Sequence, residues 1–491
     1  MSEASTPEPQ RRPLALLAGP LLAAVILALP APEALPPEGW RTAAVATWMA
    51  FWWITEAVPI PVTALLPLIL FPFLDVLSMT DAAAPYAAEV IFLFMGGFFL
   101  AAGMESCGLH RRVALGIIQR VGLGPERLVL GFMLATAFLS MWISNTATTA
   151  MMLPIGIAVV ELFRGDRPRE GFTLGVALML GIAYGASIGG VATLIGTPPN
   201  AILAGAASEL LDIQLGFGQW MLLGIPVTAV MIPIVWLLLV KVLYRPGALG
   251  GDAAEILAAE IRSLGPASRA ERRVAVVFIV TAAAWILRAP KVLGDVVVPG
   301  LQSLAPELRD STIAMAASMV LFVMGRGDGS GKPLLTWSRA RRIPWGVLIL
   351  FGGGLSLARA MERSGLSEWI GSSVAGLGSL HPIALFGILA LLFVFLTELT
   401  SNAATTTMAM PVLVGAAAAM GMAPLPFMIV ATLSSSMAFM LPVATPPNAI
   451  VFGSDYLTIP QMARAGFLLN LIAVVVVSTA AWILLPFIFP T

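Results

Sequence analysis

Long apolar runs separated by short polar segments occupy most of this 491-residue chain. A transmembrane helix needs about 20 consecutive, mostly apolar residues. Runs near that length lie at 14–31, 42–58, 60–74, 90–104, 171–192, 217–240, 273–289, 311–325, 343–360, 424–441 and 465–489. Two longer runs, 128–160 and 381–420, are each interrupted near the middle by a polar patch. The pattern predicts an all-α polytopic membrane protein.

Each interrupted run could form two spans, or a re-entrant hairpin that enters and leaves the membrane on one side. Suppose that the other runs each span once, that both interrupted runs are hairpins, and that the N-terminus is cytoplasmic. Then 21 of the 27 Lys and Arg residues fall on the cytoplasmic side and 6 on the outer side. Because cytoplasmic loops carry an excess of positive charge, this bias favours a cytoplasmic N-terminus and an outer C-terminus. It does not separate hairpins from pairs of spans, since both return the chain to the same side.

The polar patches belong to an internal repeat. SNTATTAMMLP at 144–154 corresponds to SNAATTTMAMP at 401–411, with 7 of 11 positions identical at an offset of 257 residues. The same offset aligns 93–109 with 350–366, where 10 of 17 positions are identical. Duplication in an apolar chain is typical of secondary transporters built from two related halves. In the orientation above the halves are inverted, so both patches are expected near the membrane midplane.

The repeat and the polar segments predict the domain organisation. The chain divides into a cytoplasmic N-terminus with a first transmembrane helix at 1–41, a first inverted repeat at 42–243, a cytoplasmic linker at 244–272, and a second inverted repeat at 273–491. The first apolar run could instead be a signal peptide. Two acidic residues before it, and Pro30 and Pro32 at its end, fit a cleavable signal poorly. We therefore expect an uncleaved helix.

Charge and composition exclude several classes of function. Charged residues make up 11% of the chain, and the formal net charge is zero, so nothing indicates a nucleic-acid partner. A single cysteine excludes an internal disulfide and a multi-thiolate metal site. An enzyme would need a nucleophile–base pair or metal ligands within the membrane. The repeated motifs contain no histidine and have no carboxylate pair beside them, so we do not expect an enzyme.

The two patches have the composition of an anion site. Small hydroxyl and amide residues such as Ser144, Asn145 and Ser401 cap helix N-termini well. A turn at each patch would start a new helix, whose free N–H groups and positive dipole end attract an anion. No Lys, Arg or His occurs in 128–160, 171–208 or 382–451. The charge of a bound anion would therefore be balanced by helix ends, hydroxyl groups and co-bound cations, which gives cation coupling a physical reason.

A second repeated motif follows each patch. TPPNAI occurs at 197–202 and returns unchanged at 445–450. Consecutive prolines remove two N–H donors and prevent a continuous helix, so we expect free backbone carbonyls there, at Gly196 and Ala444, to suit a small cation. One patch alone would more often serve helix packing, but paired patches with paired TPPNAI segments favour binding. Glu398 could relay a proton or organise its hairpin, and the structural role is favoured.

These motifs resemble the divalent anion/sodium symporter family, which includes the INDY-type di- and tricarboxylate transporters and solute carrier family 13. The resemblance covers nearly the whole chain and rests on SNTATTAMMLP, TSNAATTTMAMP, GTPPN and ATPPN. It implies eleven transmembrane helices with two re-entrant hairpins. It also implies homodimers, in which a transport domain moves against a scaffold domain as an elevator.

The resemblance also implies which residues bind. The first sodium site would comprise Ser140, Ser144, Asn145 and Gly196, and the second Thr397, Thr400, Asn402 and Ala444. The substrate would be bound by Ser144, Asn145, Thr146, Thr197, Ser401, Asn402, Ala403, Thr445 and Pro446. Ala403 departs from the family pattern, because many dicarboxylate members carry threonine there. The loss of that hydroxyl leaves the choice of acid open.

The sequence thus predicts sodium-coupled symport of C4-dicarboxylates, such as succinate, malate or fumarate, across the cytoplasmic membrane. Sodium is expected as a co-transported ion rather than a prosthetic group. Within transport, the alternatives are sodium-independent dicarboxylate exchange and carriage of sulfate or a tricarboxylate. A channel is a further alternative.

Overall fold

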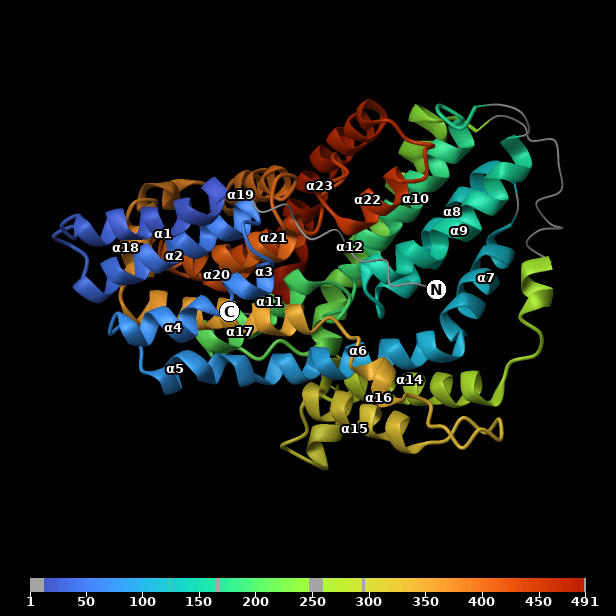
Figure 1. Cartoon of the computed structure of the whole chain (residues 1–491), viewed down its shortest axis with the longest axis horizontal. Helices are drawn as coiled ribbons and strands as arrows, with labels where there is room; N and C mark the ends of the chain where they lie inside the picture. Colours follow the sequence, from blue (N-terminus) through green and yellow to red (C-terminus); the bar gives the residue numbers. More distant parts are fainter. Residues whose placement is uncertain (1–12, 123, 165–167, 247–258, 294–295, 490–491) are drawn as a thin grey trace.

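The computed structural model describes residues 13–122, 124–164, 168–246, 259–293 and 296–489. Helices form most of it (Figure 1). The first half contains α1 (Pro13–Ala28), α2 (Pro37–Thr55), α3 (Ile60–Thr63), α4 (Leu66–Phe73), α5 (Met79–Ala83), α6 (Glu89–Cys107), α7 (Leu109–Val121), α8 (Pro125–Ser140), α9 (Asn145–Arg164), α10 (Thr173–Gly190), α11 (Pro198–Leu211) and α12 (Phe217–Leu237), which continues as a π-helical turn, Leu238–Leu243.

The second half repeats this order. It contains α14 (Arg269–Leu287), α15 (Asp310–Val323), α16 (Trp337–Ala340), α17 (Trp345–Arg363), α18 (Leu366–Ser372), α19 (Pro382–Leu396), α20 (Asn402–Ala419), α21 (Pro424–Ser435), α22 (Pro446–Phe452) and α23 (Ile459–Ile488). The series from α6 to α12 therefore corresponds to the series from α17 to α23. Short 3-10 turns lie at Ala84–Ala87, Leu301–Ser303 and Ala375–Ser379.

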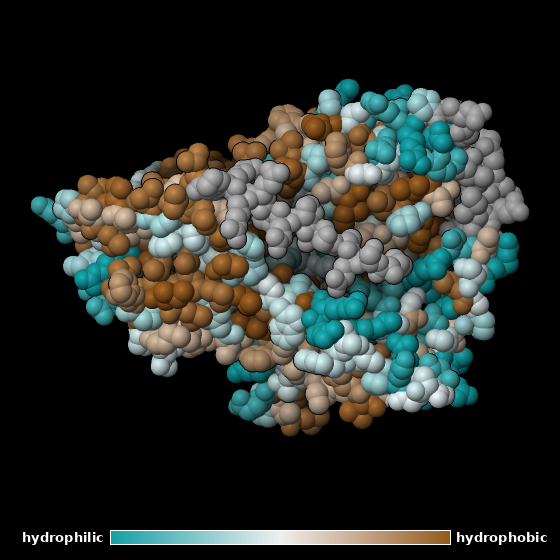
Figure 2. Space-filling view, viewed as in Figure 1, coloured by the Kyte–Doolittle hydropathy of each residue, from teal (hydrophilic) through white to brown (hydrophobic). Residues whose placement is uncertain are grey.

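Several helices are suited to a membrane. By length and composition, four stretches of the described chain could cross one: Met79–Cys107, Thr173–Gly190, Phe217–Leu243 and Ile459–Ile488. Large apolar side chains of α1 and α23 face outward, with Leu14 85% and Phe487 84% exposed. Figure 2 shows hydrophobic side chains over the part of the molecule that contains α1 and α2, and hydrophilic ones near α7 at the opposite end. Such outward apolar surface is stable in lipid rather than in water.

The structure departs from the sequence-based expectation in three local features. Residues 109–121, which lie between two of the apolar runs and for which no helix was expected, form α7. The run 60–74 is broken into α3 and α4, with Pro67 in the first turn of α4. Strands β1 (Lys291–Leu293) and β2 (Val296–Val298) pair as a small antiparallel hairpin between α14 and α15, an exception to the all-α prediction.

The repeat is visible in the backbone conformation as well as in the order of helices. Gly108 joins α6 to α7 with φ 81°, and Gly365 joins α17 to α18 with φ 73°. The two glycines are 257 residues apart, and each turn needs the left-handed conformation that glycine adopts without strain. The two halves interlock further on, because α9 packs against α22 and α11 packs against α20. Each half therefore helps to position the polar patch of the other.

Candidate functional site

Both interrupted runs break at their polar patches. In the first run α8 ends at Ser140 and α9 begins at Asn145. In the second, α19 ends at Leu396 and α20 begins at Asn402. The prediction that a new helix starts at each patch is confirmed. We call residues 141–146 and 398–403 the first and second tips.

The first turns of α9 and α20 show how the tips are capped. Ser144 Oγ accepts a hydrogen bond from Ala147 N (3.3 Å), and Ser144 O accepts one from Thr148 N (3.0 Å). At the second tip Ser401 O accepts from Thr405 N (2.8 Å), while the Ser401 hydroxyl makes no capping bond. Each helix therefore begins with N–H groups directed towards the tip, as an anion site requires.

The TPPN segments mark two unwound loops. Helix α10 ends at Gly190 and α11 begins at Pro198, while α21 ends at Ser435 and α22 begins at Pro446. The expected unwinding is confirmed, although each first proline starts the next helix instead of disrupting one. We call residues 191–197 and 436–445 the first and second loops.

Two asparagines that the sequence reasoning did not single out hold these loops. Asn200 Nδ2 donates to the carbonyl oxygens of Thr193 (2.7 Å), Gly190 and Val191 (both 3.3 Å). Asn448 Nδ2 donates to those of Leu441 (3.0 Å) and Ala438 (3.3 Å). Both asparagines are completely buried. The sequence feature that could have identified these two asparagines is their position in the repeated TPPNAI motif.

The tips and loops border one cavity of about 1620 Å³. All of the predicted substrate-binding residues line it: Ser144, Asn145, Thr146, Thr197, Ser401, Asn402, Ala403, Thr445 and Pro446. Of the predicted cation ligands, Gly196, Thr400 and Ala444 line it too, whereas Ser140 and Thr397 lie behind the tips and are fully buried. Two patches 257 residues apart in sequence therefore share one space.

The buried oxygens behind the tips have the same geometry in both halves. Ser140 Oγ donates to Asn145 Oδ1 (2.6 Å), and Thr397 Oγ1 donates to Asn402 Oδ1 (2.6 Å). Thr397 Oγ1 is also 2.9 Å from the Ser435 carbonyl oxygen. The two pairs are related by the 257-residue offset. Uncharged hydroxyl, amide and carbonyl oxygens in unwound membrane segments are the ligands by which transporters coordinate sodium.

The amide of Asn145 faces a cluster of oxygen atoms. When the amide is turned so that Nδ2 faces the cluster, it donates to Ser140 Oγ (2.6 Å), Gly196 O (3.2 Å) and Ala186 O (3.3 Å). When Oδ1 occupies that position, four oxygens face one another. A small cation among them would remove that repulsion, so the donor set fits sodium.

A close backbone approach fixes the first loop. A Cβ on Gly196 would lie 2.3 Å from the Gly190 carbonyl oxygen, and a Cβ on Gly190 would lie 2.5 Å from Asn145 Oδ1. Only glycine fits at both positions. The equivalent residues of the second half, Ala438 and Ala444, carry side chains. The two clusters are therefore similar but not identical.

Charged residues border the cavity away from the tips, where sequence reasoning did not place any. Glu56 follows α2, Glu105 lies near the end of α6, and Arg339 and Arg342 lie in and after α16. For these two arginines the structure shows no side-chain ion pair among the described residues. They belong to a segment between α15 and α17, so only the folded chain brings them towards the tips.

Comparisons with known proteins show which family the chain resembles over nearly its whole length. The family model described as "Sodium:sulfate symporter transmembrane region" matches residues 11–488. The sodium-dependent dicarboxylate transporter SdcS of Staphylococcus saprophyticus is 40% identical over 480 residues, covering 96% of this chain and 91% of the relative. SdcS of Staphylococcus aureus is 38% identical over 484 residues, covering 97% and 91%. The crystal structure of the Alcanivorax borkumensis YdaH transporter has a similar fold, with a TM-score of 0.59 and 16% identity over 97% of this chain and 98% of that one.

Proposed function

Because the chain belongs to the sodium:sulfate symporter family, we propose that it is a secondary active transporter that couples sodium entry to the uptake of C4-dicarboxylates. The observation that carries the proposal is the single cavity bordered by both tips. The name of the two staphylococcal relatives, sodium-dependent dicarboxylate transporter, supports the choice of ion and substrate. The protein is an integral membrane protein, and its relatives are transporters rather than enzymes.

The substrate is a dianion bound between the two tips. The N-termini of α9 and α20 and the hydroxyl and amide groups of Ser144, Asn145, Ser401 and Asn402 contact its carboxylates, with Thr146, Thr197, Ala403, Thr445 and Pro446 around them. Sodium ions occupy the oxygen clusters behind the tips, the first at Ser140, Ser144, Asn145 and Gly196 and the second at Thr397, Thr400, Asn402 and Ala444. Since the tips contain no basic residue, these cations supply the positive charge that the dianion needs in a medium of low dielectric constant.

The architecture that we propose has eleven transmembrane helices, two re-entrant hairpins and inverted repeats. Basic residues on the connecting segments put the N-terminus in the cytoplasm and the C-terminus outside. In this orientation Glu56, Glu105, Arg339 and Arg342 lie on the cytoplasmic side of the cavity. The structure then corresponds to an inward-facing state. Transport follows as a movement of the hairpins and loops against a scaffold domain in a homodimer.

A second candidate is sodium-independent exchange, or transport of sulfate or a tricarboxylate. Ala403 at the start of α20 favours the change of substrate only, because the cavity lacks a hydroxyl group there that many dicarboxylate members of the family carry. A missing hydroxyl leaves room for a larger acid and removes one donor to a carboxylate.

Uptake of labelled succinate into proteoliposomes tests the proposal. We expect uptake with sodium outside and little with choline outside, and we expect competition by unlabelled malate and fumarate. Uptake that ignores the sodium gradient but requires internal dicarboxylate would establish exchange. Competition by sulfate or citrate alone would establish the other substrates. We also expect sodium to raise the melting temperature of the purified protein, because an ion that binds only the folded state stabilises it.

A further inference from the structure

A buried carboxylate lies beside the second oxygen cluster. The side chain belongs to Glu398, which is 3% exposed. Its Oε1 accepts hydrogen bonds from Phe439 N (2.7 Å) and Met440 N (2.9 Å), and its Oε2 accepts one from Leu441 N (3.1 Å). Asn470 of α23 donates a fourth bond from Nδ2 to Oε1 (2.8 Å). All four donors are neutral, and no basic side chain of the described residues lies within 4.0 Å.

In the first half, the backbone N–H groups that follow α10 do not bond to a carboxylate. The residue that corresponds to Glu398 at the 257-residue offset is Met141. Helix α10 continues to Gly190, and the next N–H groups, of Val191 and Ala192, donate to carbonyl oxygens of the last helical turn at 3.2 and 3.0 Å. The TPPNAI motifs are 248 residues apart, and at this offset Ala438 corresponds to Gly190. Helix α21 ends three positions before Ala438, at Ser435. The second loop is therefore longer. Glu398 accepts hydrogen bonds from the N–H groups of this loop, which lie beyond the end of α21.

Glu398 also connects the two segments that carry the proposed ligands of the second cation. It lies between Thr397 and Thr400 in the second tip. The backbone that it holds ends at Leu441, whose carbonyl oxygen accepts from Ala444 N (3.2 Å). The hydroxyl of Thr397, one residue before the carboxylate, reaches the Ser435 carbonyl oxygen at the end of α21 (2.9 Å). The carboxylate thus fixes the second loop against the second tip.

We propose that Glu398 is a positioning residue for the second cation site, and that this site differs in kind from the first. Its carboxylate holds residues 439–441 so that the Ala444 carbonyl faces Thr397, Thr400 and Asn402. Its negative charge also lies beside the second cluster, whereas the first cluster has no carboxylate within its tip or loop. The inference rests on the proposed sodium coupling.

The test compares sodium dependence with substrate dependence in Glu398→Gln. The sodium concentration for half-maximal stabilisation against heat is measured on purified protein, with choline keeping ionic strength constant. The sodium dependence of succinate uptake and the KM for succinate at saturating sodium are measured in proteoliposomes. We expect the half-maximal sodium concentration to rise about fivefold or more in both assays, with KM for succinate at saturating sodium changed by about twofold or less. Glu398→Asp keeps the charge and should recover part of the sodium affinity.

A matched control separates this role from general loss of a buried carboxylate. Asp310 at the start of α15 is also buried and also accepts a backbone hydrogen bond, from Phe217 N (2.8 Å), but unlike Glu398 it is paired with an arginine, Arg288 (2.6 Å). Asp310→Asn should lower the melting temperature and leave the half-maximal sodium concentration unchanged.

Three outcomes would overturn the inference in distinguishable ways. Wild-type sodium dependence in Glu398→Gln would show that the carboxylate serves stability alone. If that variant does not fold, Asn470→Ala removes one donor to the carboxylate, and an unchanged sodium dependence there would likewise contradict the proposal. A wild-type protein without any sodium response would refute the coupling itself, and this inference with it.

Discussion

At the scale of residues, the site is built from neutral polar groups, and asparagine is the most informative of them. The 491-residue chain has five asparagines. Asn145 and Asn402 lie at the tips, Asn200 and Asn448 hold the loops, and Asn470 donates to Glu398. An amide offers both donors and an acceptor without a charge. It can therefore hold backbone carbonyls and contact ions at membrane depth without the desolvation cost of an ionised side chain.

We expect Asn145→Ala and Asn402→Ala each to abolish succinate uptake while most of the protein remains folded. Each change would remove a proposed cation ligand and a proposed substrate contact together, but it would leave the helix that begins there with its backbone cap. Uptake into proteoliposomes and elution on size-exclusion chromatography are the measurements. Thr281→Ala is the control, because Thr281 is buried and donates to Val277 O within its own helix (2.7 Å). Wild-type uptake by either asparagine variant would remove that residue from the site.

At the scale of elements, the sequence predicted the parts of the fold that repeat. The two patches and two TPPNAI segments located both tips and both loops, because a break within a long apolar run is visible in a single sequence. The partners of the loops were not predictable in this way. The N–H groups of 439–441 bond to a carboxylate about 40 residues earlier, and no local pattern specifies that pairing.

Helix α7 was missed for a different physical reason. It is 13 residues long, shorter than the roughly 20 residues of a membrane span. Leu109, Leu115 and Ile118 are buried, while Arg112 pairs with Glu271 (2.7 Å). An amphipathic helix on the surface of a membrane protein shows the 3.6-residue period rather than a continuous apolar run. The arginines of this segment interrupt its apolar residues, so it does not form a continuous apolar run.

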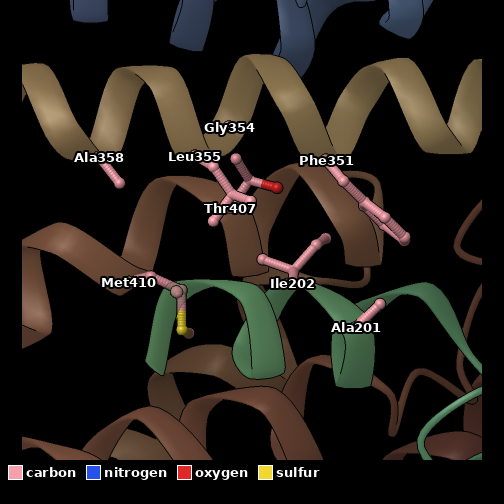
Figure 3. Close-up of a pocket in the computed structure, with 9 residues that line it drawn as sticks. Ala201, Ile202, Phe351, Gly354, Leu355, Ala358, Thr407 and Met410 are labelled. Carbon is pink, nitrogen blue, oxygen red and sulfur yellow. The ribbon is translucent and has the colours of Figure 1, made fainter. Parts of the chain in front are cut away.

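Close packing between α17, α11 and α20 gives a prediction at this scale. Figure 3 shows Gly354 and Ala358 of α17 facing Thr407 of α20 and Ile202 of α11 across a very small cavity. A Cβ on Gly354 would lie 2.3 Å from Thr407 Cγ2. We expect Gly354→Ala to lower the melting temperature, since overpacking a core costs roughly 1–3 kcal/mol. We also expect it to slow uptake, because these helices would move past one another in the elevator movement proposed above.

The matched control for this change is Gly387→Ala in α19, where an added Cβ meets nothing within 4 Å. That variant should keep or raise the melting temperature, because alanine favours a helix over glycine. Equal effects of the two substitutions would show that helix propensity, not the fit of α17 against α20, determines the result.

At the scale of the whole molecule, the two halves interlock around the cavity. The pairs α9–α22 and α11–α20 join the halves, while α17 packs along both α11 and α20. In the elevator movement proposed above, α11 and α20 travel with the tips and α17 stays with the scaffold. Contacts between α17 and α11 must then break in each cycle. Among the described residues one ion pair joins these helices, Arg359 with Glu209, with side chains 19% and 18% exposed.

This pair lies at the far end of α17 from the cavity. Val347, near the start of α17, lines the cavity, and Arg359 follows it by twelve residues, about 18 Å along a helix. An ion pair that forms on the side opposite the opening would stabilise the inward-facing state and oppose its conversion. Arg359 is also held in place from the scaffold side, because its Nη1 donates to the Asp81 carbonyl oxygen (3.2 Å).

We therefore expect Glu209→Gln to shift the population away from the inward-facing state. A cysteine at position 347, introduced after the native Cys107 is replaced by serine, reports on that state through its rate of modification by a membrane-impermeant thiol reagent in inside-out vesicles. Neutralising Glu209 should slow the modification, and the charge-swapped double variant Glu209→Arg with Arg359→Glu should restore it, because the swap recreates the pair.

Neutralising Glu362 of α17, for which the structure shows no ion pair among the described residues, is the control and should leave the rate unchanged. A rate that is the same in Glu209→Gln and in the parent would show that the pair does not bias the equilibrium, and the stability of the inward-facing state would then rest on apolar packing alone.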